Sequence, residues 1–135
     1  MTNVQATGPF EVKLNAERLS DIAETTGLGR MSLDKKFHGD LEATSQGEML
    51  AFRSGVQGSA GYVAMETVIG VLHGHHGSFV LQHSSTMTRG VPEQSITVVP
   101  DSGTGNLAGL SGQMMIAIAE GQHSYQFDYT LPENS

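Results

Sequence analysis

The sequence predicts an all-β domain in which eight antiparallel strands close into a barrel. Apolar and polar residues alternate with a period of two along most of the chain, which is typical of strands that bury one face. The 17 glycines stand between apolar runs of strand length, which indicates many short strands joined by tight turns. At 135 residues the chain is long enough for one core, so residues 1–135 are expected to form a single domain. A sandwich of two sheets is the competing architecture.

The strands are expected at residues 6–14, 30–38, 40–52, 62–72, 78–87, 94–99, 113–119 and 123–131. In the first, Phe10, Val12 and Leu14 alternate with charged residues. Gly47 in the third indicates a bulge or a bend, as barrels need. Residues 15–29 break the pattern and are expected to form a long loop with at most one short helical turn, either a plain connection or a functional lid.

The segment 100–112, PDSGTGNLAGLSG, is too rich in glycine for a regular strand. Its Leu107 and Leu110 are expected to plug one end of the core. The glycines invite a phosphate-loop interpretation, but no Lys-Ser or Lys-Thr pair follows them and no helix is predicted there. A structural turn is therefore favoured.

The hairpin from Tyr62 to Met87 has the clearest pattern, with two strands flanking the turn sequence HGHHG. One face of its first strand carries Tyr62, Ala64, Glu66, Val68, Gly70 and Leu72. The corresponding face of its second strand carries Phe79, Leu81, His83 and Ser85. A carboxylate and an imidazole therefore fall on faces that are otherwise mostly apolar or aromatic.

Glu66 and His83 are accordingly the candidate catalytic residues. A carboxylate removed from water has a raised pKa and can act as a general acid or base, so the pKa of Glu66 is expected to lie above about 4.3. A turn that pairs Gly74 with Gly77 makes the two residues diagonal neighbours, within reach of long side chains. A turn centred on His76 and Gly77 separates them. Glu66→Gln is expected to shift the titration of His83 and to change the stability of the fold little.

Both residues are structural if the face points outward or if hydrogen bonds within the protein satisfy them. The candidate ligand-binding residues are Tyr62, Phe79, Leu81, Tyr125, Phe127 and Tyr129. The last three share one face of their strand, where aromatic residues line a pocket or belong to an ordinary core. His73, His75 and His76 have no acidic or cysteine ligand nearby in the sequence, and stable sites need three or four converging ligands. Neither a metal site nor a cofactor is expected.

The chain carries 14 acidic against 7 basic residues, a formal net charge of −7, and no cysteine. Nucleic acids and anionic membranes are therefore not expected as partners. The sequence has neither an apolar run long enough to span a bilayer nor a secretory signal, so a cytoplasmic location is expected. An outer face with Val63, Met65, Ile69 and Val71 is unusually apolar for a monomer, which favours a homodimer.

Longer motifs add a resemblance to a known family. The stretch VVPDSGTGNLAGLSG, with GSFVLQH before it, FHGDLEATS earlier and YQFDY near the end, resembles a bacterial family of domains of unknown function. The resemblance covers nearly the whole chain and implies a fold similar to allene oxide cyclase, an eight-stranded antiparallel barrel. The pattern GTG-x-L-x-G-L-x-G also resembles its counterparts in allene oxide cyclases and dirigent proteins. Ile96 stands where many family members have an aromatic residue, which implies a differently shaped pocket here.

Three functions follow as hypotheses. The first is a cofactor-independent isomerase or cyclase, in which Glu66 and His83 move a proton on a small hydrophobic substrate. The relatives that the resemblance names, allene oxide cyclases and dirigent proteins, bind apolar molecules in the barrel and steer cyclisation or coupling, but the resemblance carries no activity over to this family. The second is a module that binds a small hydrophobic molecule without chemistry. The third is a solid barrel with a structural or interaction role, since eight-stranded barrels can be filled by side chains.

Overall fold

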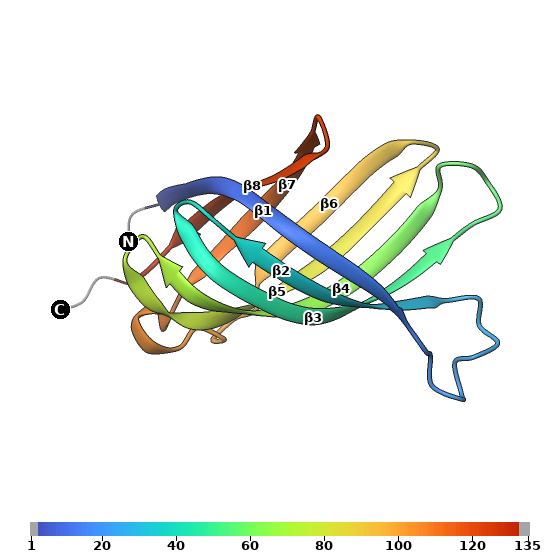
Figure 1. The fold of residues 1–135 in the computed structure, drawn as a ribbon, viewed down its shortest axis with the longest axis horizontal. Helices are drawn as coiled ribbons and strands as arrows, with labels where there is room; N and C mark the ends of the chain where they lie inside the picture. The colour runs from blue at the N-terminus through green and yellow to red at the C-terminus, as the bar shows by residue number, and fades with distance from the viewer. Residues whose placement is uncertain (1–2, 133–135) are drawn as a thin grey trace.

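The computed structural model describes residues 3–132 and has one closed barrel of eight antiparallel strands (Figure 1). The strands are β1 (Asn3–Glu17), β2 (Gly29–Phe37), β3 (Leu41–Arg53), β4 (Ala60–Leu72), β5 (His75–Thr88), β6 (Val91–Val98), β7 (Ser111–Ala119) and β8 (Gln122–Thr130). Each strand pairs with the next, and β8 returns to β1. The predicted fold class is confirmed, and the sandwich is not formed. Apart from the short 3-10 turn Gly105–Leu107, the described residues form no helix, and none lies in a helix able to cross a bilayer.

Tight turns with glycine in second position set the register of three hairpins. Both central residues have positive φ at His73-Gly74, Arg89-Gly90 and Glu120-Gly121. This is the type I′ geometry, whose twist matches that of the flanking strands. The turn at His73-Gly74 places Leu72 opposite His75, so neither register considered from the sequence is the observed one.

The first connection is a loop, as predicted, but it is shorter than 15–29 because β1 continues to Glu17. Residues 18–28 project from one end of the barrel (Figure 1). Successive turns replace the helical turn considered from the sequence: the N–H of Ala23 donates to the oxygen of Ser20, and the N–H of Thr26 donates to that of Ala23.

The barrel interior is filled at the end where β1 begins and β8 ends (Figure 1). We call this the packed half. Its side chains include Phe37, Leu41, Leu72, Phe79, Leu81, Leu107, Leu110, Tyr125, Phe127 and Tyr129. Leu107 and Leu110 are buried at this end, as the sequence predicted. The rings of Phe79 and Phe127 stack with centroids 5.7 Å apart.

The wall of the barrel is weakest between β6 and β7. These strands share a single aligned pair, Thr97 with Gln113, whereas β5 and β6 align along the whole of β6. Gln94 bridges part of the gap, because its Oε1 accepts a hydrogen bond from the N–H of Ile116 at 3.0 Å. The facing backbone edges near Gln94 and Ile116 are therefore joined through a side chain.

Candidate functional site

Four polar side chains form one layer across the barrel interior. Lys35 comes from β2, Ser45 from β3, Glu66 from β4 and His83 from β5, four neighbouring strands. They are 6%, 1%, 1% and 3% exposed. The period of two along each strand directs all four inward, among residues that are otherwise mainly apolar. We call this group the polar layer.

Glu66 is the centre of the polar layer. Its Oε2 lies 2.8 Å from Nζ of Lys35 and 2.8 Å from Nε2 of His83. Its Oε1 accepts a hydrogen bond of 2.9 Å from the hydroxyl of Ser45. Both carboxylate oxygens are therefore used within the protein. Glu66 and His83 are diagonal neighbours, because Glu66 aligns with Leu81 and His83 with Ala64.

The surroundings of Glu66 keep it ionised. Burial alone would raise its pKa, but the hydrogen bond from His83 and the charge of Lys35 outweigh burial and lower the pKa to about 2. The sequence prediction of a raised pKa is wrong, because the pattern on β4 revealed the burial but not the cation on β2. Glu66 is therefore a poor candidate for a proton acceptor and a good one for an anchor.

Glu66 fixes the orientation of the His83 ring. With Glu66 ionised, Nε2 of His83 carries the proton of their hydrogen bond, and Nδ1 is the acceptor nitrogen of the neutral ring. Among the described residues, Nδ1 of His83 has no hydrogen-bond partner. Every side-chain nitrogen or oxygen of these residues that is shielded from solvent does have a partner. Nδ1 must therefore reach open space, which agrees with the position of His83 on a cavity wall.

Gly47 makes room for Glu66. The two residues are directly opposite each other on β3 and β4. A Cβ at position 47 would overlap the backbone oxygen of Met65 and would lie 2.9 Å from Cβ of Glu66. The sequence predicted a bulge or a bend at Gly47. The pairing of β3 with β4 is uninterrupted, so there is no bulge, and β3 curves along its length (Figure 1).

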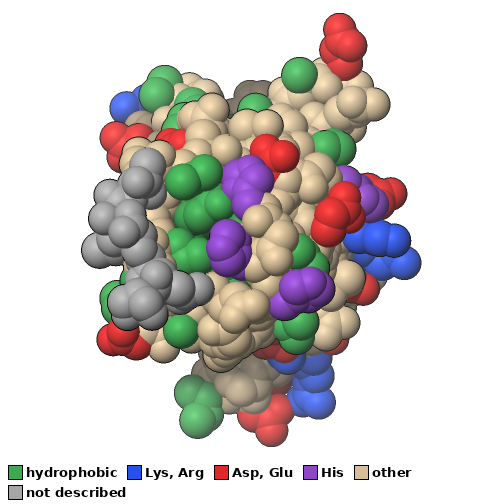
Figure 2. All heavy atoms as spheres, turned by 90° about the vertical axis from the view of Figure 1, so that its left-hand side faces the viewer, with side chains coloured by type: hydrophobic (Ala, Val, Ile, Leu, Met, Phe, Trp, Pro, Cys, Tyr) green, Lys and Arg blue, Asp and Glu red, His purple; other side chains and the backbone are tan. Residues whose placement is uncertain are grey.

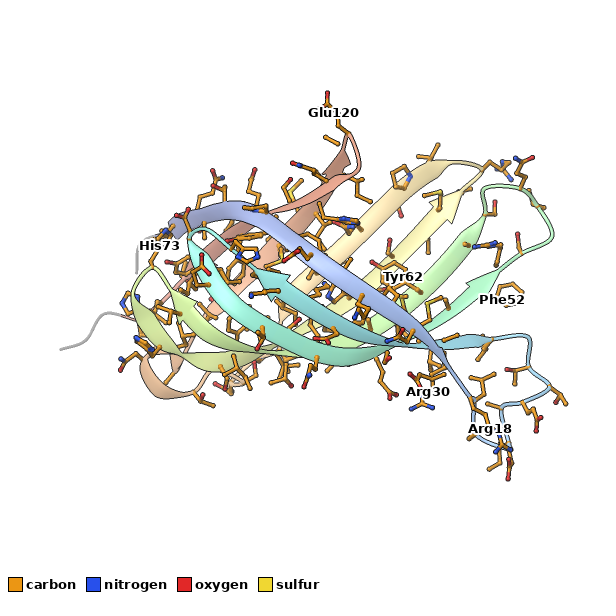
Figure 3. All side chains as sticks on the ribbon, viewed as in Figure 1. Arg18, Arg30, Phe52, Tyr62, His73 and Glu120 are labelled. Carbon is orange, nitrogen blue, oxygen red and sulfur yellow. The ribbon has the colours of Figure 1, made fainter. Side chains whose placement is uncertain are left out.

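Beyond the polar layer, the other half of the barrel holds a cavity of about 690 Å³. Lys35 and His83 line it together with a mainly apolar wall that includes Val12, Leu14, Met31, Leu33, Met49, Ala51, Ala64, Met87, Ile116 and Ile118. Phe52, also in the wall, lies toward the end of the barrel opposite His73 (Figure 3). The barrel is therefore not solid along its whole length.

Tyr62 is the one predicted ligand-binding residue in the wall of this cavity, and it lies inside the barrel in Figure 3. Its ring centroid is 6.4 Å from that of His83. Burial raises the pKa of Tyr62, and the charge of Glu66 adds to this effect, while the hydroxyl of Ser85 opposes it. The phenol is therefore neutral and can donate a hydrogen bond.

The other five predicted ligand-binding residues belong to the packed half: Phe79, Leu81, Tyr125, Phe127 and Tyr129. The hydroxyl of Tyr125 accepts a hydrogen bond from the N–H of Leu41 at 2.8 Å and donates one to the oxygen of His38 at 2.7 Å. Burial raises the pKa of Tyr125 to about 12. The pattern located these residues on the inner face but could not tell which half of the barrel they occupy.

Histidine side chains gather on the end of the barrel shown in Figure 2. His73 contacts the hydroxyl of Tyr129, and its Nε2 lies 3.6 Å from Oδ2 of Asp40. Nδ1 of His75 is bonded to the backbone oxygen of Leu72 at 3.1 Å. Over residues 3–132, no group of three or more histidine, cysteine or acidic side chains is placed to hold a metal ion.

Two members of the polar layer, Lys35 and Ser45, were missed from the sequence. A signal for Lys35 exists, because it stands at a period of two with Leu33 and Phe37. A lysine at an inward position of a strand is rarely buried without a partner. Ser45 carries no comparable signal, since a serine suits either face of a strand.

These features define a class of protein: a closed eight-stranded barrel, packed at one end and hollow at the other, with a buried polar layer between. The chain matches the family described as "Protein of unknown function (DUF3224)" over residues 6–129 and belongs to it. A crystal structure of a DUF3224 protein of unknown function from Shewanella oneidensis MR-1 is 49% identical to this chain. The match covers 98% of this chain and 100% of that one, with a TM-score of 0.90. No curated protein matches, and the likeness to allene oxide cyclase stays a prediction.

Proposed function

We propose that this protein binds a small, mostly apolar molecule inside the barrel, with a polar group of the ligand against Lys35 and His83. The observation that carries this proposal is that the apolar cavity ends on the polar layer. Ligand sites typically combine an apolar wall with a few convergent polar groups that fix orientation. The volume of about 690 Å³ falls within the usual range for such sites.

The polar layer itself supports a role in binding. A buried ion pair adds little net stability, and apolar residues of similar size often serve the fold as well or better. The Lys35–Glu66 pair lies inside the barrel with both side chains almost fully buried. Its place beside a cavity is therefore better explained by a ligand than by the needs of the fold.

A second candidate is catalysis of an isomerisation, and the open Nδ1 of His83 favours it. In this scheme Lys35 donates a hydrogen bond to a carbonyl oxygen of the substrate, and Nδ1 removes a proton from the adjacent carbon. With a β,γ-unsaturated carbonyl substrate, the electron pair of the broken C–H bond forms a C=C bond while the carbonyl π pair moves to the oxygen, and His83 returns the proton to the γ carbon of the resulting dienolate. Glu66 is a positioning residue here, not the base.

Binding is tested with N-phenylnaphthylamine, a neutral apolar dye whose fluorescence rises in apolar surroundings. Ala51→Phe narrows the cavity near its mouth, and Leu50→Phe places the same ring on the outer face of the same strand. We expect Ala51→Phe to weaken dye binding by about tenfold or more and Leu50→Phe to leave it unchanged. Equal binding by both folded variants, or no binding by the native protein, contradicts the proposal.

The outer face of the barrel supports a homodimer. Val63, Met65 and Ile69 on the outer face of β4 are about half exposed, and a second copy of this chain is the partner that we propose for them. A sedimentation mass equal to that of one chain at micromolar concentration would contradict this. A cytoplasmic location stays a prediction.

A further inference from the structure

The charges on the cavity wall are opposite in sign to those of the whole chain. The chain carries a formal net charge of −7. Of the described residues that line the cavity, none is acidic, whereas Lys35, Arg53, His83 and His123 are basic. Such a bias in a low-dielectric recess favours an anion over a cation or a neutral ligand.

The floor of the cavity retains hydrogen-bonding capacity for such an anion. The ammonium of Lys35 has three N–H donors. Among the described residues it donates one of them to Glu66, so two are available for a ligand. Its Nζ also lies 5.3 Å and 5.8 Å from the ring centroids of Phe10 and Phe37, which offer no acceptor. Glu66 is not in the cavity wall, so its negative charge does not directly face a ligand.

We infer that the ligand is an apolar carboxylate, held with its carboxylate against Lys35 and His83 and its apolar body toward the mouth of the barrel. This inference rests on the proposed function and names the ligand class for the same site. An amine is disfavoured because Lys35 would repel it. An uncharged alcohol would make a weaker hydrogen bond with the ammonium of Lys35 than a carboxylate does.

Charge balance predicts that the carboxylate enters together with a proton. Lys35 and Glu66 already neutralise each other, so a further anion needs a proton on Nδ1 of His83, which then donates to the ligand. Besides His83, the ionisable groups in the cavity wall are Lys35 on β2, Arg53 on β3, Tyr62 on β4 and His123 on β8, and Glu66 on β4 contacts His83 from behind the wall. Because binding takes up this proton, affinity should fall as the pH rises.

The same prediction separates the two candidate functions. Catalysis by His83 as a base requires Nδ1 without a proton, so turnover would increase with pH. Binding of a carboxylate requires Nδ1 with a proton, so affinity decreases with pH. The reverse orientation, with the carboxylate at the exposed Arg53, is distinguished by mutation.

The test compares decanoate with decanol as competitors of N-phenylnaphthylamine on the native protein. We expect decanoate to bind at least about tenfold more tightly than decanol, and to lose affinity as the pH is raised. Lys35→Met should abolish the preference for decanoate, and Lys36→Met, on the outer face of the same strand, should preserve it. Arg53→Gln should weaken the preference less than Lys35→Met does. The comparison of the two ligands on the native protein does not depend on the folding of any variant.

Equal or tighter binding of decanol overturns the carboxylate inference and leaves the proposed function intact. Loss of the preference in Arg53→Gln, with the preference kept in Lys35→Met, overturns the assigned orientation. Failure of the native protein to bind the dye, decanoate or decanol overturns the inference and the proposed function together.

Discussion

Nζ of Lys35 and Oε2 of Glu66 lie 2.8 Å apart inside the barrel, and both side chains are almost fully buried. Breaking such a pair from one side leaves a charge in a medium that solvates it poorly. His83 and Ser45 bind the same carboxylate, so the consequences of a substitution extend over the whole polar layer.

Glu66→Gln and Lys35→Met should each lower the free energy of unfolding by about 3–5 kcal/mol, because each leaves the other charge buried without its partner. The double variant should be destabilised by less than the sum, since neither charge then remains. Urea denaturation of the native protein and the three variants measures this coupling. Additive losses would show that the two side chains do not depend on each other. A large loss in Glu66→Gln would also correct the sequence prediction of a small change.

Acid should weaken the fold through Glu66. Its pKa is about 2 in the folded protein against an ordinary 4.5, so the ionised form stabilises the fold above about pH 4.5. This contribution, roughly 3 kcal/mol, is lost as the pH falls toward 2. Urea denaturation between these pH values should show a steeper loss of stability in the native protein than in Glu66→Gln. Parallel curves for the two proteins would rule out this source of acid sensitivity.

Gly47→Ala should destabilise the protein by more than about 2 kcal/mol, because the added methyl group overlaps backbone atoms of β4 beside Glu66. Gly55→Ala is the matched control, since a Cβ there meets no atom within 4 Å. Thermal or urea denaturation compares the two variants. Similar stability in both would mean that β3 and β4 can separate at this point without cost.

The seam between β6 and β7 should open more readily than any other part of the wall. Backbone amides that face the seam, such as that of Ile116, should exchange with solvent faster than those of β4, which is paired on both sides. Gln94→Ala removes the side-chain bridge to Ile116 and should increase the exchange of that amide further. Ser95→Ala, an exposed position next to Gln94, serves as the control. Protection at Ile116 equal to that of β4 would contradict a weak seam.

Much of the fold could be predicted from the sequence because its pattern is local. The period of two along β4 and β5 put Glu66 and His83 on the inner face, and glycines marked the hairpin turns. The register could not be predicted, since it depended on whether His73-Gly74 or a later pair formed the type I′ turn. The predicted contact between Glu66 and His83 is nevertheless present, because the observed register also makes them diagonal neighbours.

Of the polar layer, Glu66 and His83 could be predicted from the sequence, whereas the contact of Glu66 with Lys35 could not. Lys35 and Glu66 are far apart in the chain, and their contact exists only after β2, β3 and β4 align. The sign of the Glu66 pKa change depends on that contact. The position of Phe127 in the packed half and of Tyr62 in the cavity likewise depends on which end the segment 100–112 fills.

The most direct test of a ligand at the polar layer is ¹⁵N NMR of the histidine rings during titration with decanoate near pH 6. We predict that the Nδ1 resonance of His83 shifts as this atom gains a proton and a hydrogen bond to the ligand, while Nε2 keeps its bond to Glu66. The exposed His76 should not respond. An unchanged His83 spectrum at a decanoate concentration that displaces the dye would contradict the account.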